Sequence, residues 1–179
     1  MADQARRVYQ RALRLLARRP RSTAELSERL ARLGNPEVVR AVLQRLEQEG
    51  LLDDLQFARL WVMSRRATRR FGVGRLRQEL LAKGVGREAA EEALQLVQGE
   101  DETELAERLA RARLRVYRGL EAKVAARRLG AYLARRGFSS STIASVLRRV
   151  ELPDPSPSGK GPYGGTWGTS GRRTRPRIQ

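Results

Sequence analysis

Cysteine and histidine are both absent from the chain, and aromatic residues make up only 5% of it. Without thiolate and imidazole groups, the sequence offers no disulfide, no histidine pH switch, no nucleophile paired with histidine and few ways to bind zinc. So few aromatic residues argue against one large core and favour several small helical modules. We therefore expect a protein that is not an enzyme and that holds no metal or cofactor.

Long apolar runs are missing as well. No stretch is apolar over the length of a membrane span, and the chain does not open with the charged, apolar and small residues of a signal segment. We therefore expect a soluble, cytoplasmic protein that makes no contact with a membrane.

Lysine is almost absent, although the chain is strongly basic. Only Lys83, Lys123 and Lys160 are lysines among 37 basic residues, and the formal net charge is +17. A charge of that sign and size favours a polyanion, most plausibly nucleic acid, or an acidic protein surface. Arginine binds phosphate and carboxylate groups bidentately. A GC-rich genome or a hot environment also enriches arginine, so the preference for arginine is weak evidence by itself.

Residues 51–85 predict two helices joined by a glycine turn. Asp53 is followed by Gln56 in the pattern of a capping box, so a helix should begin there. Gly72 and Gly74 should break this helix, and a second one should end at Gly84. The apolar face of the first helix is predicted to contain Phe57, Leu60, Trp61 and Ser64, with Arg59, Arg65 and Arg66 on another face.

Similar start signals occur on both sides of this stretch. Ser22 with Glu25 forms another capping box, and Asn35 followed by Pro36 predicts the start of a further helix. Asp101 can cap a helix in the last third of the chain. These signals predict short helices throughout.

A leucine and glycine pattern occurs three times. The recurring set is Leu26, Leu30 and Gly34, then Leu76, Leu80 and Gly84, then Leu129, Leu133 and Gly137. Units of this length cannot bury their apolar faces alone, so neighbouring copies must stack. We predict an all-α fold of three tandem three-helix repeats that form an elongated curved rod, followed by a disordered basic tail rich in proline and glycine. The predicted ranges are 1–52, 53–99 and 100–152 for the repeats and 153–179 for the tail.

Basic residues cluster once in each copy, over 6–21, 65–87 and 108–136. If the copies stack in register, these clusters could line one side of the rod and attract a phosphate backbone. The alternative is that the charges only alternate around solvent-exposed helices. We prefer the basic stripe, because the clusters recur with the repeat.

Two local motifs allow a second interpretation. Residues 83–86 read Lys-Gly-Val-Gly, as in turns that hold a DNA phosphate at a helix N-terminus, but a helix end explains them first. Asp53 and Asp54 could be imagined as metal ligands, although helix capping explains them better. Neither motif predicts a catalytic site.

Several short runs in the middle copy together resemble the signature of one family. They are Leu51-Leu52-Asp53-Asp54, Phe57-Ala58, Arg65-Arg66, Phe71-Gly72, Arg75-Leu76-Arg77-Gln78-Glu79-Leu80 and Lys83-Gly84-Val85. This pattern resembles the RecX family of bacterial recombination regulators. The flanking copies fit that family's tandem three-helix repeats over roughly residues 8–150, and the tail lies outside the resemblance.

The resemblance implies a modulator of the RecA recombinase, usually a negative one. Members of the family resemble a curved rod that lies in the groove of the RecA–DNA filament, contacts successive protomers, and suppresses ATP hydrolysis and strand exchange. The implied partners are the RecA filament, single-stranded DNA and duplex DNA. The protein is expected to bind them as a monomer. A stand-alone helical DNA-binding protein, transcriptional or architectural, is the alternative. The candidate contact residues are Arg65, Arg66, Arg69, Arg70, Arg75, Arg77, Arg127, Arg128, Arg135 and Arg136.

Overall fold

The computed structural model describes residues 2–97 and 101–153. Within these two segments every regular element is a helix and none is a strand. No helix in them combines the length and the apolar character needed to cross a bilayer. The tail predicted over 153–179 lies outside the described residues except for Pro153.

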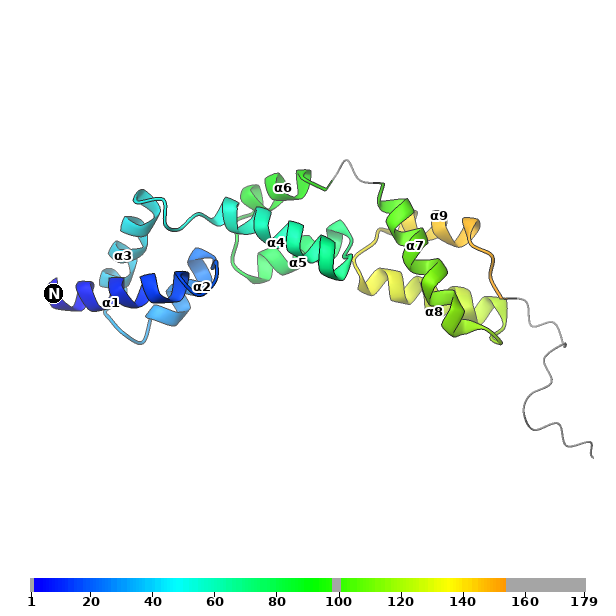
Figure 1. Cartoon of the computed structure of the whole chain (residues 1–179), viewed down its shortest axis with the longest axis horizontal. Helices are drawn as coiled ribbons and strands as arrows, with labels where there is room; N and C mark the ends of the chain where they lie inside the picture. Colours follow the sequence, from blue (N-terminus) through cyan, green and yellow to red (C-terminus); the bar gives the residue numbers. More distant parts are fainter. Residues whose placement is uncertain (1, 98–100, 154–179) are drawn as a thin grey trace, which may run out of the picture.

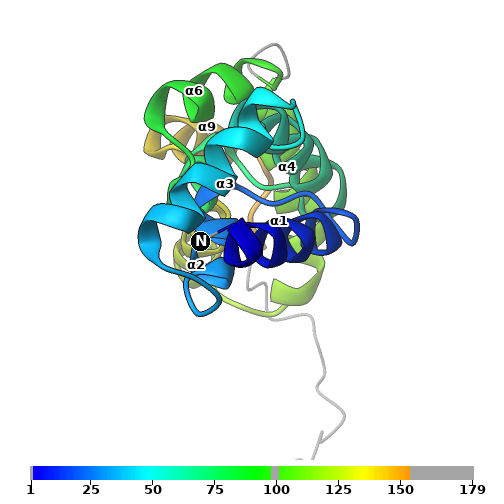
Figure 2. The ribbon, with the colours of Figure 1, turned by 90° about the vertical axis from the view of Figure 1, so that its left-hand side faces the viewer.

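The helices form three bundles in a row that arches gently in Figure 1, and the view along this row in Figure 2 superimposes the bundles. This arrangement confirms the predicted all-α rod of three-helix repeats. The first bundle contains α1 (Ala2–Leu16), α2 (Thr23–Leu30) and α3 (Pro36–Gln48). The second bundle contains α4 (Asp54–Arg69), α5 (Val73–Ala82) and α6 (Arg87–Gln95). The third bundle contains α7 (Glu102–Leu114), the 3-10 turn η1 (Arg115–Tyr117), α8 (Ala122–Arg135) and α9 (Ser140–Arg149).

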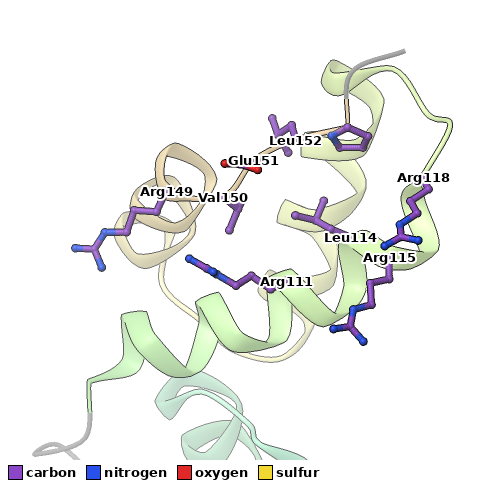
Figure 3. Close-up of a pocket in the computed structure, with 9 residues that line it drawn as sticks. Arg111, Leu114, Arg115, Arg118, Arg149, Val150, Glu151 and Leu152 are labelled. Carbon is purple, nitrogen blue, oxygen red and sulfur yellow. The ribbon is translucent and has the colours of Figure 1, made fainter. Parts of the chain in front are cut away.

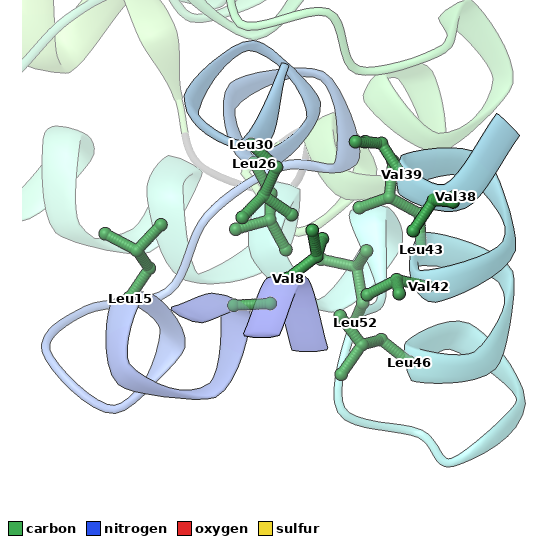
Figure 4. Close-up of a cluster of buried hydrophobic side chains, with 11 residues drawn as sticks. Val8, Leu15, Leu26, Leu30, Val38, Val39, Val42, Leu43, Leu46 and Leu52 are labelled. Atoms are coloured by element: carbon green, nitrogen blue, oxygen red, sulfur yellow. The ribbon is translucent and has the colours of Figure 1, made fainter. Parts of the chain in front are cut away.

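Each bundle has its own apolar core. In the first bundle, Val8 of α1, Leu30 of α2 and Leu46 of α3 are fully buried against one another (Figure 4). Separate cores fill the second and third bundles. Burial of a leucine or valine side chain contributes about 1.5 to 3 kcal/mol, so each small core needs all of its large members. The six leucines of the repeated pattern all have no exposed surface, namely Leu26, Leu30, Leu76, Leu80, Leu129 and Leu133.

The predicted helix starts are confirmed at four positions. The carboxylate of Asp53 accepts a hydrogen bond from the backbone N–H of Gln56 at 2.9 Å. Ser22, Asn35 and Asp101 accept equivalent bonds at the starts of α2, α3 and α7. Each of these caps satisfies a backbone donor that the first turn of a helix leaves without a partner.

The predicted apolar face and the predicted end of α4 are both wrong in part. Leu60 is 53% exposed and Ser64 is exposed as well, because the buried stripe runs through Ala58 and Val62, next to Phe57, and so turns Leu60 and Ser64 toward solvent. The helix also ends before the glycines. Arg70 closes it in the left-handed conformation with φ of 53°, so Gly72 does not break the helix.

The first and second bundles meet where the start of α2 packs on the turn after α5. The hydroxyl of Ser22 donates to the carbonyl oxygen of Lys83 at 2.6 Å, and the backbone N–H of Thr23 donates to the carboxylate of Asp54 at 2.7 Å. Lys83 also forms a 2.6 Å ion pair with Glu25 of α2. Asp54 therefore satisfies a free donor at the start of α2 and so caps a helix of the neighbouring repeat, which joins the two repeats.

The second and third bundles meet in the equivalent way, through the start of α5 and the turn after α8. The N–H of Gly72 donates to the carbonyl oxygen of Arg136 at 2.8 Å, and the N–H of Gly74 donates to that of Gly137 at 3.1 Å. A Cβ atom added at Gly72 would lie 2.6 Å from the Gly137 oxygen. The two glycines are therefore needed for close backbone contact between bundles.

The first of these junctions should weaken in acid. Burial raises the pKa of the Glu25 carboxyl, but hydrogen bonds from Lys83 and Arg19 outweigh that effect and hold the pKa below its ordinary value. A carboxylate with a lowered folded-state pKa stabilises the fold above its unfolded value of about 4.3, and this stabilisation is lost as pH falls through the folded-state value. The Lys83 ammonium lies 4.2 Å from the ring of Trp61, so that ring reports on the junction.

We expect a change in Trp61 fluorescence below about pH 4 in a Trp167→Phe background, where Trp61 is the remaining tryptophan. Glu25→Gln is the matched control and should remove most of that transition. An identical acid transition in the Glu25→Gln variant would show that another carboxyl group controls the junction.

Candidate functional site

Several arginines of the middle bundle are paired with carboxylates of the same bundle. Arg65 and Arg75 both contact Glu79, at 3.4 and 3.3 Å. Arg77 forms a two-point pair with Glu91, at 2.5 and 2.9 Å. The hydrogen bond from Arg77 lowers the pKa of the Glu91 carboxyl. These three candidates therefore reach solvent with much of their charge already compensated.

Arg65 is held further by an aromatic ring. Its guanidinium carbon lies 4.1 Å from the centre of the Trp61 ring, and the indole N–H of Trp61 donates to Glu79 at 3.1 Å. A cation over an indole face is attracted by the ring quadrupole. Trp61 thus fixes an arginine and an acid on the surface of the second bundle.

Arg66 does not face solvent, and the prediction that it lies on another face than Phe57 is wrong, because both are buried on the same side of α4. Its side chain is 6% exposed and donates to the carbonyl oxygen of Phe71 at 2.9 Å. Its guanidinium also lies 3.5 Å from Glu102, which accepts a bond from the N–H of Val73 at 2.8 Å. Arg66 and Glu102 thus connect the second bundle to the start of the third.

The remaining candidates divide into exposed residues and one junction residue. Arg136 is half-buried, donates to the carbonyl oxygen of Arg69 and lies 5.0 Å from the ring of Tyr132. The others are exposed and have no carboxylate partner within the described segments, and these are Arg69, Arg70, Arg127, Arg128 and Arg135.

The turn after α5 serves as a helix end. Gly84 has φ of 73° and its N–H donates to the carbonyl oxygen of Leu81, while the N–H of Val85 donates to that of Leu80. The helix-end interpretation is therefore confirmed, because these two donors are already satisfied and the start of α2 covers Gly84. The phosphate-turn interpretation stays a prediction.

A hollow beside α1, which we call the α1 hollow, brings together basic residues that sequence reasoning did not select. It has a volume of about 780 Å³. The basic character of α1 is visible in the sequence, but the arrival of Arg32 from the end of α2 is not. Its lining residues are Asp3, Arg6, Arg7, Gln10, Arg11, Arg14, Arg32 and Leu33.

A second hollow of about 580 Å³ lies at the far end of the rod, between the end of α7 and the segment after α9 (Figure 3). Leu114 and Val150 lie on facing walls, and Leu152 and Pro153 add to the apolar lining. Glu107 pairs with two of its four arginines, at 2.7 and 3.8 Å. These four arginines are Arg111, Arg115, Arg118 and Arg149. No group of acidic residues suited to a metal ion occurs in the described part of the chain.

Three family models match successive parts of this chain. The models of the first, second and third three-helix domains of RecX match residues 9–46, 53–94 and 100–147. The "Regulatory protein RecX" of Thermobifida fusca is 39% identical over 152 residues, covering 81% of this chain and 82% of that protein. The protein of the same name from Mycobacterium leprae is 44% identical over 138 residues, covering 75% and 80%.

Solved structures give the same result for the fold. A crystal structure of regulatory protein RecX superimposes with a TM-score of 0.75 at 30% identity, covering 81% of this chain and 72% of that one. RecX from Lactobacillus salivarius superimposes with a TM-score of 0.76, covering 83% and 97%, and its 23% identity supports likeness of fold alone.

Proposed function

Because this chain belongs to the RecX family of regulatory proteins, we propose that it modulates the RecA recombinase, acting as an inhibitor that binds in the groove of the RecA–DNA filament. It would act in the cytoplasm as a monomer and without catalytic chemistry of its own. The observation that carries this proposal is the row of three bundles joined by two equivalent junctions. A row of repeated surfaces suits a partner that is itself a helical repeat of identical subunits.

Inhibition would follow from occupancy. A rod bound to several neighbouring protomers stabilises the filament geometry that fits it. Because it binds this geometry more tightly than any other, it opposes a reaction cycle in which the filament must change geometry. ATP hydrolysis and strand exchange would both slow for this reason. The junctions matter here, because bundles that moved independently would transmit little of that preference from one protomer to the next.

We assign the first contacts with acidic groups of the filament to the exposed arginines that have no carboxylate partner within the described segments. These groups lose no internal pair on binding, whereas Arg65, Arg75 and Arg77 must share their charge with Glu79 and Glu91. The residues assigned are Arg69, Arg70, Arg127, Arg128 and Arg135.

A RecA ATPase assay on single-stranded DNA tests the proposal. We expect stoichiometric protein to suppress steady-state hydrolysis, and the variant Arg69→Gln/Arg70→Gln to suppress it several-fold less well. The variant Arg75→Gln/Arg77→Gln removes equal charge from the same bundle, but its arginines are paired, so it should retain more of the effect. Unchanged hydrolysis at stoichiometric wild-type protein, at low and at physiological salt, would refute the proposal.

The α1 hollow favours a second candidate, a stand-alone DNA-binding protein. That function predicts tight, salt-sensitive binding to bare duplex DNA with a preferred sequence. Weak binding to every duplex, together with strong binding to the recombinase filament, would eliminate it.

A further inference from the structure

We propose that the α1 hollow binds the sugar–phosphate backbone of DNA, and that α1 is a helix destabilised by its own charges until phosphates neutralise them. The inference rests on the proposed function only in taking DNA as the partner. It names the surface and the chemical group through which the first bundle would touch that partner.

The arginines of the α1 hollow have almost no internal partners within the described segments. Arg7 lies 3.5 Å from Asp3, and both side chains are at least 74% exposed, so water screens most of their attraction. In the same part of the chain, no carboxylate pairs with Arg6, Arg11, Arg14 or Arg32. The middle bundle pairs Arg59, Arg65, Arg75 and Arg77 with acids and leaves Arg69, Arg70 and Arg87 without a carboxylate partner in the described segments. The α1 hollow differs in gathering its unpaired arginines around one concave surface.

The spacing of these charges opposes helix formation. Arg7 and Arg11 are four residues apart, and Arg11 and Arg14 are three apart, so like charges lie side by side on one face of α1. Arg6 and Arg7 also lie in the first half of the helix, nearer the positive end of its dipole. Residues that lower the stability of their own helix in this way are expected at functional sites.

The polar lining of the hollow favours phosphate groups over an acidic protein as its ligand. Its lining includes one large apolar side chain, Leu33, whereas the hollow of the third bundle includes Leu114, Val150 and Leu152. An acidic protein segment would bring apolar groups that need such a surface.

The dimensions also fit a phosphate backbone. The arginines from position 6 to position 14 extend over about 12 Å of helix, at about 1.5 Å for each residue. Duplex DNA carries one charge in about every 1.7 Å of its axis, so this length faces several phosphates at once. Arg32, which follows α2, lies outside this line and widens the basic surface beside α1. Phosphates can therefore approach arginines of α1 and of the turn after α2.

The test compares two variants of the full chain in DNA binding and in thermal unfolding, without recombinase. For Arg7→Gln/Arg11→Gln, which removes the like charges four residues apart, we expect affinity for a 20-nucleotide single strand to fall about tenfold at low salt, and the slope of log affinity against log salt to shrink by about 1.4. The same variant without DNA should melt at a higher temperature than the wild type, because the like charges are gone.

The control Arg29→Gln/Arg40→Gln removes two exposed arginines of the same bundle that lie outside the hollow. It should change the salt slope by less than half as much. Equal effects of the two variants on DNA binding, or a lower melting temperature for the hollow variant, would overturn the proposal.

A third measurement separates DNA from an acidic protein. An oligonucleotide should slow amide hydrogen exchange in α1 of the wild type more than poly-glutamate of equal charge does. Stronger protection by poly-glutamate would assign the hollow to an acidic protein and reject the DNA proposal. Because no recombinase is present in these assays, their failure leaves the ATPase result untouched, and the reverse also holds.

Discussion

Gly137→Ala is expected to lower the free energy of unfolding by about 3 to 4 kcal/mol. Gly137 has φ of 87°, a left-handed conformation that costs an alanine about 1 to 2 kcal/mol. Its added methyl group would also clash with the backbone N and the Cα of Arg75, near the start of α5 in the neighbouring bundle. Backbone atoms cannot move aside as a side chain can, so the clash must separate the second and third bundles or distort both.

Gly119→Ala is the matched control for this experiment. Gly119 has the same φ of 87°, but within the described segments no atom lies within 4 Å of the place that an added Cβ atom would take. Urea unfolding followed by helical circular dichroism should show a loss of about 1 to 2 kcal/mol for this variant. The difference between the two variants measures the junction. Equal losses would mean that the close contact between bundles contributes nothing to stability.

The same pair of variants tests the proposed mechanism. If inhibition requires a rod whose bundles move together, Gly137→Ala should lose most of its effect on RecA at temperatures where its helices remain intact. Gly119→Ala should keep the effect. Full inhibition by a folded Gly137→Ala variant would show that the bundles act separately.

The parts of this fold that the sequence predicts are those that depend on near neighbours. A cap such as Asp53 bonds to a residue three positions away, and the recurring leucines report a period within one helix. The face of α4 is harder to predict. Positions 57, 60, 61 and 64 and positions 57, 58, 62 and 66 both follow helical spacing, and the packing of α4 against other helices, mostly α6, selects the second set. Spacing alone therefore misplaces Leu60.

The junctions could not be predicted, because each depends on a partner in another repeat. Gly74 follows an ordinary helix-start pattern, yet its N–H bonds to Gly137, which the chain brings near only after another bundle has formed. Asp54 reads as a second acid beside a cap, but it binds the backbone of Thr23. The candidate surface shows the same limit. Sequence spacing cannot reveal that Glu79 and Glu91 occupy the arginines of the middle bundle, or that Arg32 joins α1.

Arg66→Ala is expected to lower the free energy of unfolding by about 3 kcal/mol. The change leaves the carbonyl oxygen of Phe71 without this donor and removes the positive charge 3.5 Å from Glu102, whose side chain is 24% exposed. A carboxylate that loses its neighbouring cation in a partly buried site keeps the cost of its desolvation. The expected loss is at the low end for a buried pair, because Glu102 retains some water and its bond from Val73.

Three further variants identify the source of that loss. Arg69→Ala changes a neighbouring exposed arginine and should cost less than about 0.5 kcal/mol. Arg66→Met keeps most of the side-chain volume but not the charge, and adding Glu102→Gln to it should recover part of the loss, since the partner is then no longer charged. Because Arg66 is buried, folded Arg66→Met should bind DNA as well as the wild type does. Weaker DNA binding by a fully folded Arg66→Met variant would show that Arg66 contacts the partner directly. A loss of stability as large for Arg69→Ala would show that the loss does not come from the contact between Arg66 and Glu102.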